Sequence, residues 1–174
     1  MDMAVADRVL VGDATETGLL RFSGQKLANI DRLPDMYPKI LEIPFTSQTK
    51  FHMTIHRKSH PNGGLTLHMK GAPEVVWEAC STIWVDGKAA PIDEGWTRKF
   101  ETTFAELAKQ GNRVLAVAML QLHGDKYPDN CIFSIEKKNF PTKDLTFLGL
   151  VGLEDPPKEG VAEAIGKGKI TVVT

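Results

Sequence analysis

The chain has 174 residues, of which 42% are hydrophobic and 25% charged, a balance typical of one soluble globular domain, or of one domain with a piece of a neighbour. Its formal net charge of -1 excludes the electropositive face on which nucleic-acid binding depends, so we expect no nucleic-acid partner. Its two cysteines, Cys80 and Cys131, match neither a disulfide framework nor a zinc pattern, which predicts a reducing, cytosolic setting.

The first predicted elements are a capped helix, a connection and a strand. Residues 13–16 place an acid three positions ahead of a glutamate, as at a helix N-terminus, and we expect that helix to run to about Lys26. Its predicted buried residues are Leu19, Leu20 and Phe22. Pro34, and Pro38 directly after the segment, mark residues 31–37 as a connection, after which residues 39–45 alternate as a strand.

The next two segments predict an antiparallel hairpin with one buried face. The apolar face is formed by Phe51, Met53, Ile55, Leu65, Leu67 and Met69. The opposite face is polar and basic and carries His52, Thr54, His56, Thr66, His68 and Lys70. This alternation has the period of two that strands impose, and residues 61–64 between the segments are a strong turn signal. By the same alternation Lys50 belongs to the polar face.

The remainder predicts both helices and strands. In chain order we expect a short helix over 72–80, a hairpin over 83–90, a helix over 93–110, a strand over 113–122, a polar loop, a further strand over 132–137 and a strand over 145–153. Residues 155–157, Asp-Pro-Pro, fit neither a helix interior nor a central strand and predict a stiff boundary. A short helix and an apolar strand follow, as at the start of a parallel α/β unit.

These elements predict an α+β fold with a mostly antiparallel sheet flanked by helices. We expect residues 1–154 to form this domain. Residues 155–174 are then a hinge and the truncated start of an α/β domain, because the strand over 170–173 has no partner strands in this sequence.

Basic side chains at strand ends are the first candidates for a binding site. Lys50, Lys70 and Arg113 each lie at the end of a predicted strand, where their charge suits a phosphate. Phe45 offers a flat ring to a base, and Glu16 offers an acceptor to an exocyclic amine. The residues alone leave two interpretations open: a site for an anionic, planar ligand, or solvated surface charges beside a core phenylalanine.

Three other signals are weaker. His52 and His56 share a strand face without a carboxylate or cysteine at matching spacing, so we expect pocket-lining or solvated histidines and no metal site. Neither cysteine has a catalytic context, and buried packing is the expected role of both. Residues 160–167 miss the spacing of a P-loop, so a nucleotide would be bound without that motif.

Several longer strings occur in the order found in P-type ATPases. They are GDATETGLL at 12–20, EIPF at 42–45, MKGAPE at 69–74, RVL at 113–115 and DPPK at 155–158. With these strings spread over essentially the whole chain, the sequence resembles the nucleotide-binding domain of the sodium/potassium- and hydrogen/potassium-transporting ATPase alpha subunits. The Lys-Gly-Ala-Pro-Glu string is highly specific.

The resemblance implies a mixed sheet flanked by helices, with ATP in a pocket on that sheet. It implies that Phe45 stacks on the adenine, that Glu16 hydrogen-bonds near it and that His52 contacts the base. The other implied residues are Lys50 at the pocket mouth, Lys70 and Gly71 in its inner wall, Arg113 toward the phosphates or ribose, Leu115 supporting the base, and Asp155 and Lys158 in the hinge to the phosphorylation domain.

Two positions depart from the pattern of that family. Sodium-pump-like sequences usually have glutamine where His52 stands, so we expect the base contact to become pH-sensitive or to be lost. The hinge motif normally ends in arginine, and Lys158 keeps the charge without the bidentate phosphate contact.

The resemblance also implies what the intact protein does. No Asp-Lys-Thr-Gly-Thr string occurs, so we expect the aspartate that accepts the γ-phosphate, and most Mg²⁺ ligands, outside this chain, which has no catalytic residue of its own. The implied partners are ATP, the phosphorylation and actuator domains and the transmembrane part of the same polypeptide, and a beta subunit, with this domain on the cytosolic face of the membrane. The alternative is a catalytically degenerate domain that acts as a protein-interaction or regulatory module.

Overall fold

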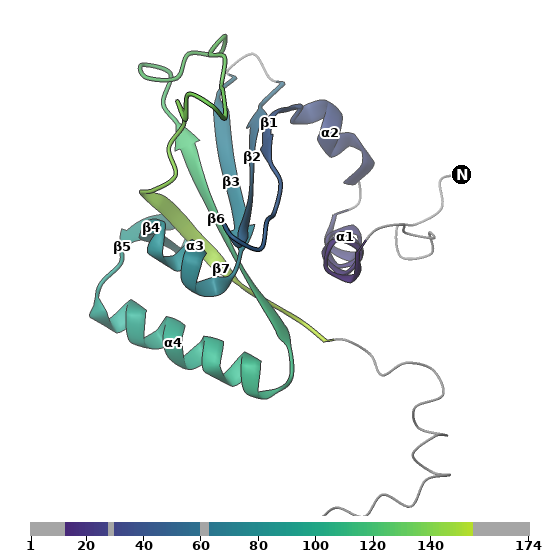
Figure 1. The fold of residues 1–174 in the computed structure, drawn as a ribbon, viewed down its shortest axis with the longest axis vertical. Helices are drawn as coiled ribbons and strands as arrows, with labels where there is room; N and C mark the ends of the chain where they lie inside the picture. Colours follow the sequence, from purple (N-terminus) through teal and green to yellow (C-terminus); the bar gives the residue numbers. More distant parts are fainter. Residues whose placement is uncertain (1–12, 28–29, 60–62, 155–174) are drawn as a thin grey trace, which may run out of the picture.

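The computed structural model describes residues 13–27, 30–59 and 63–154. Within these ranges the chain forms one seven-stranded sheet in the order β1-β2-β3-β6-β7-β4-β5 (Figure 1). The strands are β1 (Lys39–Ile43), β2 (Phe51–Arg57), β3 (Leu65–Gly71), β4 (Cys80–Val85), β5 (Lys88–Pro91), β6 (Arg113–Leu122) and β7 (Leu145–Leu153). All neighbouring pairs are antiparallel except β4 and β7, which are parallel. The predicted α+β fold is confirmed.

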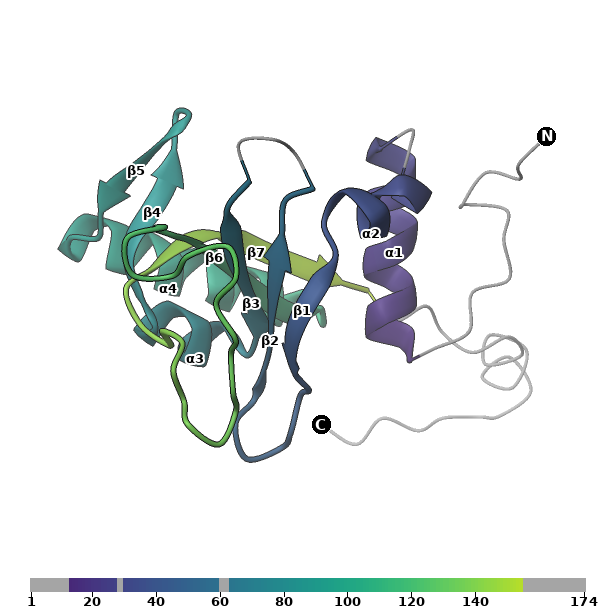
Figure 2. The same cartoon turned by 90° about the horizontal axis from the view of Figure 1, so that it is seen from above.

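Helices lie on both sides of the sheet. They are α1 (Ala14–Lys26), the 3-10 turn η2 (Ile30–Arg32), α2 (Leu33–Met36), α3 (Pro73–Glu78) and α4 (Glu94–Lys109). Figure 1 and the view from above in Figure 2 show α3 and α4 on one side of the sheet and α1 and α2 on the other. The two faces of the sheet are therefore covered differently. On one face α3 and α4 enclose the core, and on the opposite face lies α1.

The core fills the space between the sheet and the α3–α4 side. Its buried strand residues are Met53, Ile55, Leu65, Leu67, Met69, Ala116, Ala118, Leu122, Leu145 and Phe147. The alternation read from the sequence for β2 and β3 is thus confirmed for its apolar half. Trp77 of α3 stacks on Phe100 of α4 with 4.3 Å between ring centroids, and both rings meet Phe147 edge-on. These aromatic contacts fix both helices against β7.

The two long helices each begin at an aspartate cap, and the cap of α1 is the one that the sequence predicts. The Asp13 carboxylate accepts hydrogen bonds from the backbone N–H groups of Thr15 and Glu16 at 2.8 and 3.0 Å. Asp93 does the same for Trp96 at 2.8 Å. Each carboxylate satisfies donors that the first helical turn leaves without partners. Hydrogen bonds from the backbone of Glu16 and then Thr15 also lower the pKa of Asp13.

Two expectations about local structure are wrong. Leu20 and Phe22 are exposed and Leu19 is only partly buried, because these side chains are spread around α1 and the helix contacts the sheet through Glu16 and Thr15 of its first turn. Residues 132–137 form no strand. The Asn139 side chain closes this segment as a loop, accepting from the Ser134 N–H and donating to the Ile132 carbonyl. The predicted turn at 61–62 and all predicted elements of 155–174 lie outside the described residues.

Candidate functional site

The face of the sheet opposite the core, called the open face below, gathers most of the predicted site residues. Ala116 and Ala118 of β6 point into the core, so strand alternation puts Arg113 and Leu115 on the open face. The register pairs His52 of β2 with Lys70 of β3. Three adjacent strands therefore present the predicted side chains side by side, as the polar alternation of the sequence indicates.

The first turn of α1 meets the open face through charged and polar side chains. The Lys70 ammonium contacts both carboxylate oxygens of Glu16, at 2.5 and 2.7 Å. The Arg113 guanidinium donates to the Thr15 hydroxyl at 3.0 Å. The Lys70–Glu16 contact spans 54 positions of the sequence and the Arg113–Thr15 contact spans 98. The fold therefore brings the predicted residues Glu16, Lys70 and Arg113 together. The sequence does not predict that the two charged candidates Glu16 and Lys70 bind each other.

A closed turn connects β1 to β2 and carries Phe45 and Lys50 at its ends. Thr46 holds it shut, because its carbonyl accepts from the Lys50 N–H at 2.8 Å and its hydroxyl accepts from the Thr49 N–H at 3.0 Å. The Phe45 side chain is 60% exposed, so its ring is open to a planar ligand.

Lys50 does not occupy the position that strand alternation predicts. It lies just before β2 in the left-handed region, with φ of 58°, so the period of two does not extend to it. Its ammonium instead lies 3.9 Å from Glu74 in the first turn of α3. The Lys50 side chain is thus directed to α3, while its backbone closes the turn that carries Phe45.

Gly71 allows this turn to approach the end of β3. A Cβ atom at Gly71 would lie 2.3 Å from the Lys50 carbonyl oxygen and 2.7 Å from the Cα of Phe51. That carbonyl also accepts a hydrogen bond from the Ala72 N–H at 2.9 Å. The absence of a side chain at Gly71 therefore positions Lys50 and the turn beside Lys70.

His52 is anchored by a carboxylate that the sequence reading did not single out. Its Nε2 lies 2.9 Å from Oε1 of Glu42 on β1. The second Glu42 oxygen contacts the Lys39 ammonium. Hydrogen bonds from Lys39 first and His52 second lower the pKa of Glu42. The sequence signal that could have identified Glu42 is its polar position between two apolar residues of its strand.

Two further histidines extend the polar face toward α2. His56 contacts the Tyr37 carbonyl at 2.8 Å and the Thr54 hydroxyl at 3.0 Å. Its ring meets His68 edge-on, with 5.5 Å between centroids. Burial, and then the charge of His56, lower the pKa of His68. Among the described residues, no three His, Cys, Asp or Glu side chains form a group suited to a metal ion.

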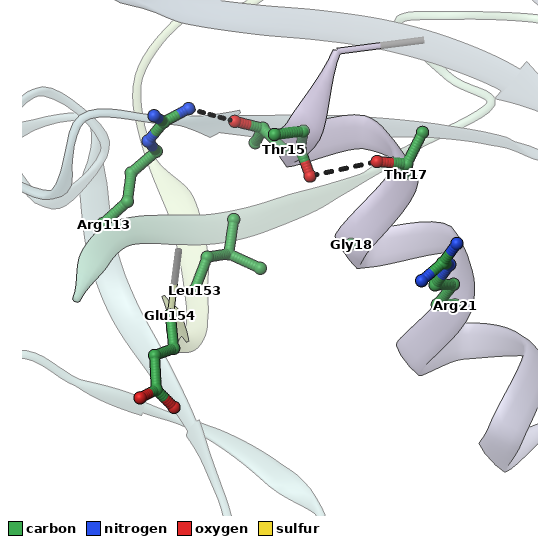
Figure 3. A pocket seen from close by; sticks show the side chains of 8 residues that line it. Thr15, Thr17, Gly18, Arg21, Arg113, Leu153 and Glu154 are labelled. Atoms are coloured by element: carbon green, nitrogen blue, oxygen red, sulfur yellow. Dashed lines mark hydrogen bonds between the residues drawn. The ribbon is translucent and has the colours of Figure 1, made fainter. Parts of the chain in front are cut away.

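A pocket of about 320 Å³ lies where α1 passes the ends of β6 and β7. Its lining includes Thr15, Gly18, Arg21, Arg113 and Leu153. Figure 3 shows Arg113 reaching to Thr15, with Arg21 further along the same helix. Of the described residues that the resemblance implies, only Arg113 lines this pocket. The pocket therefore lies beside the group formed by Glu16, Lys70 and Arg113 and does not contain it. Arg21 and Leu153 were missed because no motif or alternation marks them.

The remaining predicted residues have simpler surroundings. Leu115 is partly buried on β6 and pairs with Val151 of β7. Burial raises the pKa of the Cys80 thiol to about 12, which agrees with its expected packing role. The hinge residues Asp155 and Lys158 lie outside the described residues. No helix within the described ranges is long and apolar enough to cross a membrane.

Comparison with known proteins identifies the family. Residues 2–160 match the family model described as P-type ATPase, cytoplasmic domain N. The chain is 42% identical over 164 residues to potassium-transporting ATPase alpha chain 2 of Oryctolagus cuniculus, and 38% identical over 166 residues to sodium/potassium-transporting ATPase subunit alpha-2 of Gallus gallus. These matches cover 94% and 95% of this chain but 15% and 16% of the relatives. The chain thus spans about one sixth of their length, and it belongs to the P-type ATPases, in which it corresponds to the cytoplasmic domain N.

Proposed function

We propose that this chain binds ATP on the open face of its sheet, as the nucleotide-binding domain of a cation-transporting P-type ATPase. The observation that supports this most strongly is the meeting of Lys70, Glu16 and Arg113 beside a turn that exposes Phe45. Cations and an accessible ring are the two features that a nucleoside triphosphate requires of a site that lacks a P-loop.

In the proposed complex the adenine stacks on Phe45, and Leu115 supports it from β6. The triphosphate lies toward Lys70 and Arg113, with Lys50 at the mouth. Each of these cations already faces an acceptor of the protein: Glu16, Thr15 and Glu74, in turn. Binding therefore exchanges contacts within the protein for contacts with phosphate. Such an exchange keeps the net gain small and favours an affinity of about millimolar.

For the intact pump we propose that this domain delivers the γ-phosphate to an aspartate outside the chain, driving transport of the sodium/potassium or hydrogen/potassium type. The residues of this chain bind and orient the nucleotide, and Mg²⁺ held mainly by other parts of the protein stabilises the charge that develops on phosphoryl transfer. The partners are the phosphorylation and actuator domains, the membrane part of the same polypeptide and a beta subunit, with this domain on the cytosolic side.

Titration of the ¹⁵N-labelled chain with ATP tests the proposal. We expect saturable amide shifts around Phe45, Lys70 and Gly71, and the loss of most binding in Phe45→Ala and Lys70→Ala. Lys88→Ala is a matched control, because Lys88 lies on β5 at the far edge of the sheet from β1. If several millimolar ATP shifts none of these amides, the proposal fails and the degenerate, protein-binding alternative gains support.

A further inference from the structure

The pocket between α1 and the ends of β6 and β7 extends the proposed nucleotide site beyond the residues that the resemblance implies. We propose that this pocket takes the terminal phosphates of ATP, and that Arg21 binds them from α1 while Arg113 binds them from β6. The inference rests on the proposed nucleotide-binding function, and it adds to that function a phosphate subsite and the residue that distinguishes a triphosphate from a monophosphate.

One face of α1 forms a wall of the pocket. Ala14, Gly18 and Arg21 recur at the spacing of a helix face, and all three line the cavity of about 320 Å³. Gly18 brings this face close to β7, because a Cβ atom there would lie 3.2 Å from the Cδ2 atom of Leu153. The packing of the helix against the end of β7 therefore shapes the cavity, whose volume lies within the range of ligand pockets.

The charged side chains that line the pocket are two guanidinium groups and one carboxylate. Arg113 donates to the Thr15 hydroxyl at 3.0 Å, which directs it to the start of α1. Arg21 is exposed, and within the described part of the chain no hydrogen bond or ion pair engages it. Figure 3 shows the Glu154 carboxylate turned away from both guanidinium groups. The pocket thus offers net positive charge in the planar, forked form that binds phosphate oxygens in pairs.

Strand register places the pocket and the turn that carries Phe45 at the same end of the sheet. This turn leads into β2, whose start pairs with the end of β3, and that end pairs with the first half of β6. Arg113 begins β6, two strand spacings or about 10 Å from β2, and Lys70 lies on β3 between them. A base stacked on Phe45 therefore leaves the pocket beside Arg21 to the phosphates farthest from it.

Titration of the 174-residue chain with AMP and with ATP, without Mg²⁺ and at constant ionic strength, tests the subsite. Arg21→Gln should weaken ATP binding about two- to five-fold, the range of an exposed ion pair, and should leave AMP binding unchanged. Arg98→Gln removes the same charge from α4, on the other side of the sheet, and should change neither affinity. Equal ATP affinities of the two variants, or an equal loss of AMP and ATP binding in Arg21→Gln, would overturn the inference and leave the proposed function standing.

Side-chain ¹Hε–¹⁵Nε spectra of the arginines locate the phosphates directly. At equal saturation we expect ATP to shift the Nε signals of Arg21 and Arg113, and AMP to leave that of Arg21 in place. Inorganic phosphate at the same concentration is the control for general anion binding. If phosphate or AMP shifts Arg21 as far as ATP does, the pocket is an adventitious anion site only and the inference is overturned. If neither nucleotide binds the unsubstituted chain, the proposed function fails and this inference fails with it.

Discussion

Replacing Gly71 with alanine is the sharpest test of how the site is built. The new Cβ would lie 2.3 Å from the Lys50 carbonyl oxygen and 2.7 Å from the Cα of Phe51. Both contacts are with backbone atoms, so no side-chain rotation relieves the clash. The backbone at the start of β2 must therefore move. Overpacking of this kind costs about 1–3 kcal/mol in the free energy of unfolding. For a chain of this size that lowers Tm by about 3–9 °C.

Urea unfolding followed by circular dichroism measures the effect, and Gly152→Ala is the control. A Cβ at Gly152 finds its nearest neighbour, in Asn112, at 3.4 Å, an ordinary contact. We expect this control to unfold within about 0.5 kcal/mol of the unsubstituted chain. Gly71→Ala should also weaken ATP binding, because it displaces the turn that carries Lys50 and Phe45. Equal unfolding midpoints for the two alanine variants would refute this reasoning.

Three further predictions concern single groups. A double-mutant cycle of Glu16→Gln and Lys70→Met should give a coupling in the free energy of unfolding of only about 0.2–1 kcal/mol, because Glu16 is half exposed. A coupling above about 2 kcal/mol would contradict the surface character of the pair. The lowered pKa of His68 means that the unfolded chain binds a proton at this residue more readily than the folded chain does. Stability to urea should therefore fall as the pH drops below 6.5, and His68→Gln should lessen that fall. The same dependence of stability on pH in the variant would refute this prediction. Cys80, with its pKa raised to about 12, should resist iodoacetamide at pH 8 until urea unfolds the chain, as read by mass spectrometry; rapid labelling of the folded chain contradicts this.

Much of the fold follows from local sequence rules. Strict alternation in β2 and β3 predicts their pairing and their buried face, since a shift of one residue would expose Met53 and Leu67. The cap at Asp13 locates the start of α1. The order of the strands does not follow in the same way. The neighbour of β3 is β6, separated from it by α3, β4, β5 and α4, and such long-range pairing depends on the whole core.

The errors arise where tertiary contacts replace local preference. Leu20 and Phe22 were expected to be buried because α1 is a helix with apolar residues, but its first turn is held to the sheet by Glu16 and Thr15. The loop at 132–137 has strand-like composition, yet the Asn139 side chain provides the hydrogen bonds that a neighbouring strand would otherwise supply.

The arrangement of the candidate residues could be predicted where motif and strand alternation coincide. His52 and Lys70 lie on the same face by period alone, and the register pairs them. Lys50 breaks that rule because its backbone adopts a positive φ that alternation cannot anticipate. The partners of these residues, Glu42 for His52 and Thr15 for Arg113, emerge only from distances in the folded chain.

The central claim is that ATP occupies the open face, with its base on Phe45, and intermolecular nuclear Overhauser effects test it most directly. With the labelled chain near saturation, the adenine H2 and H8 protons should give cross-peaks to the Phe45 ring and to the side chains of His52 and Leu115. Cross-peaks confined to α3 and α4, on the opposite side of the sheet, would contradict the account.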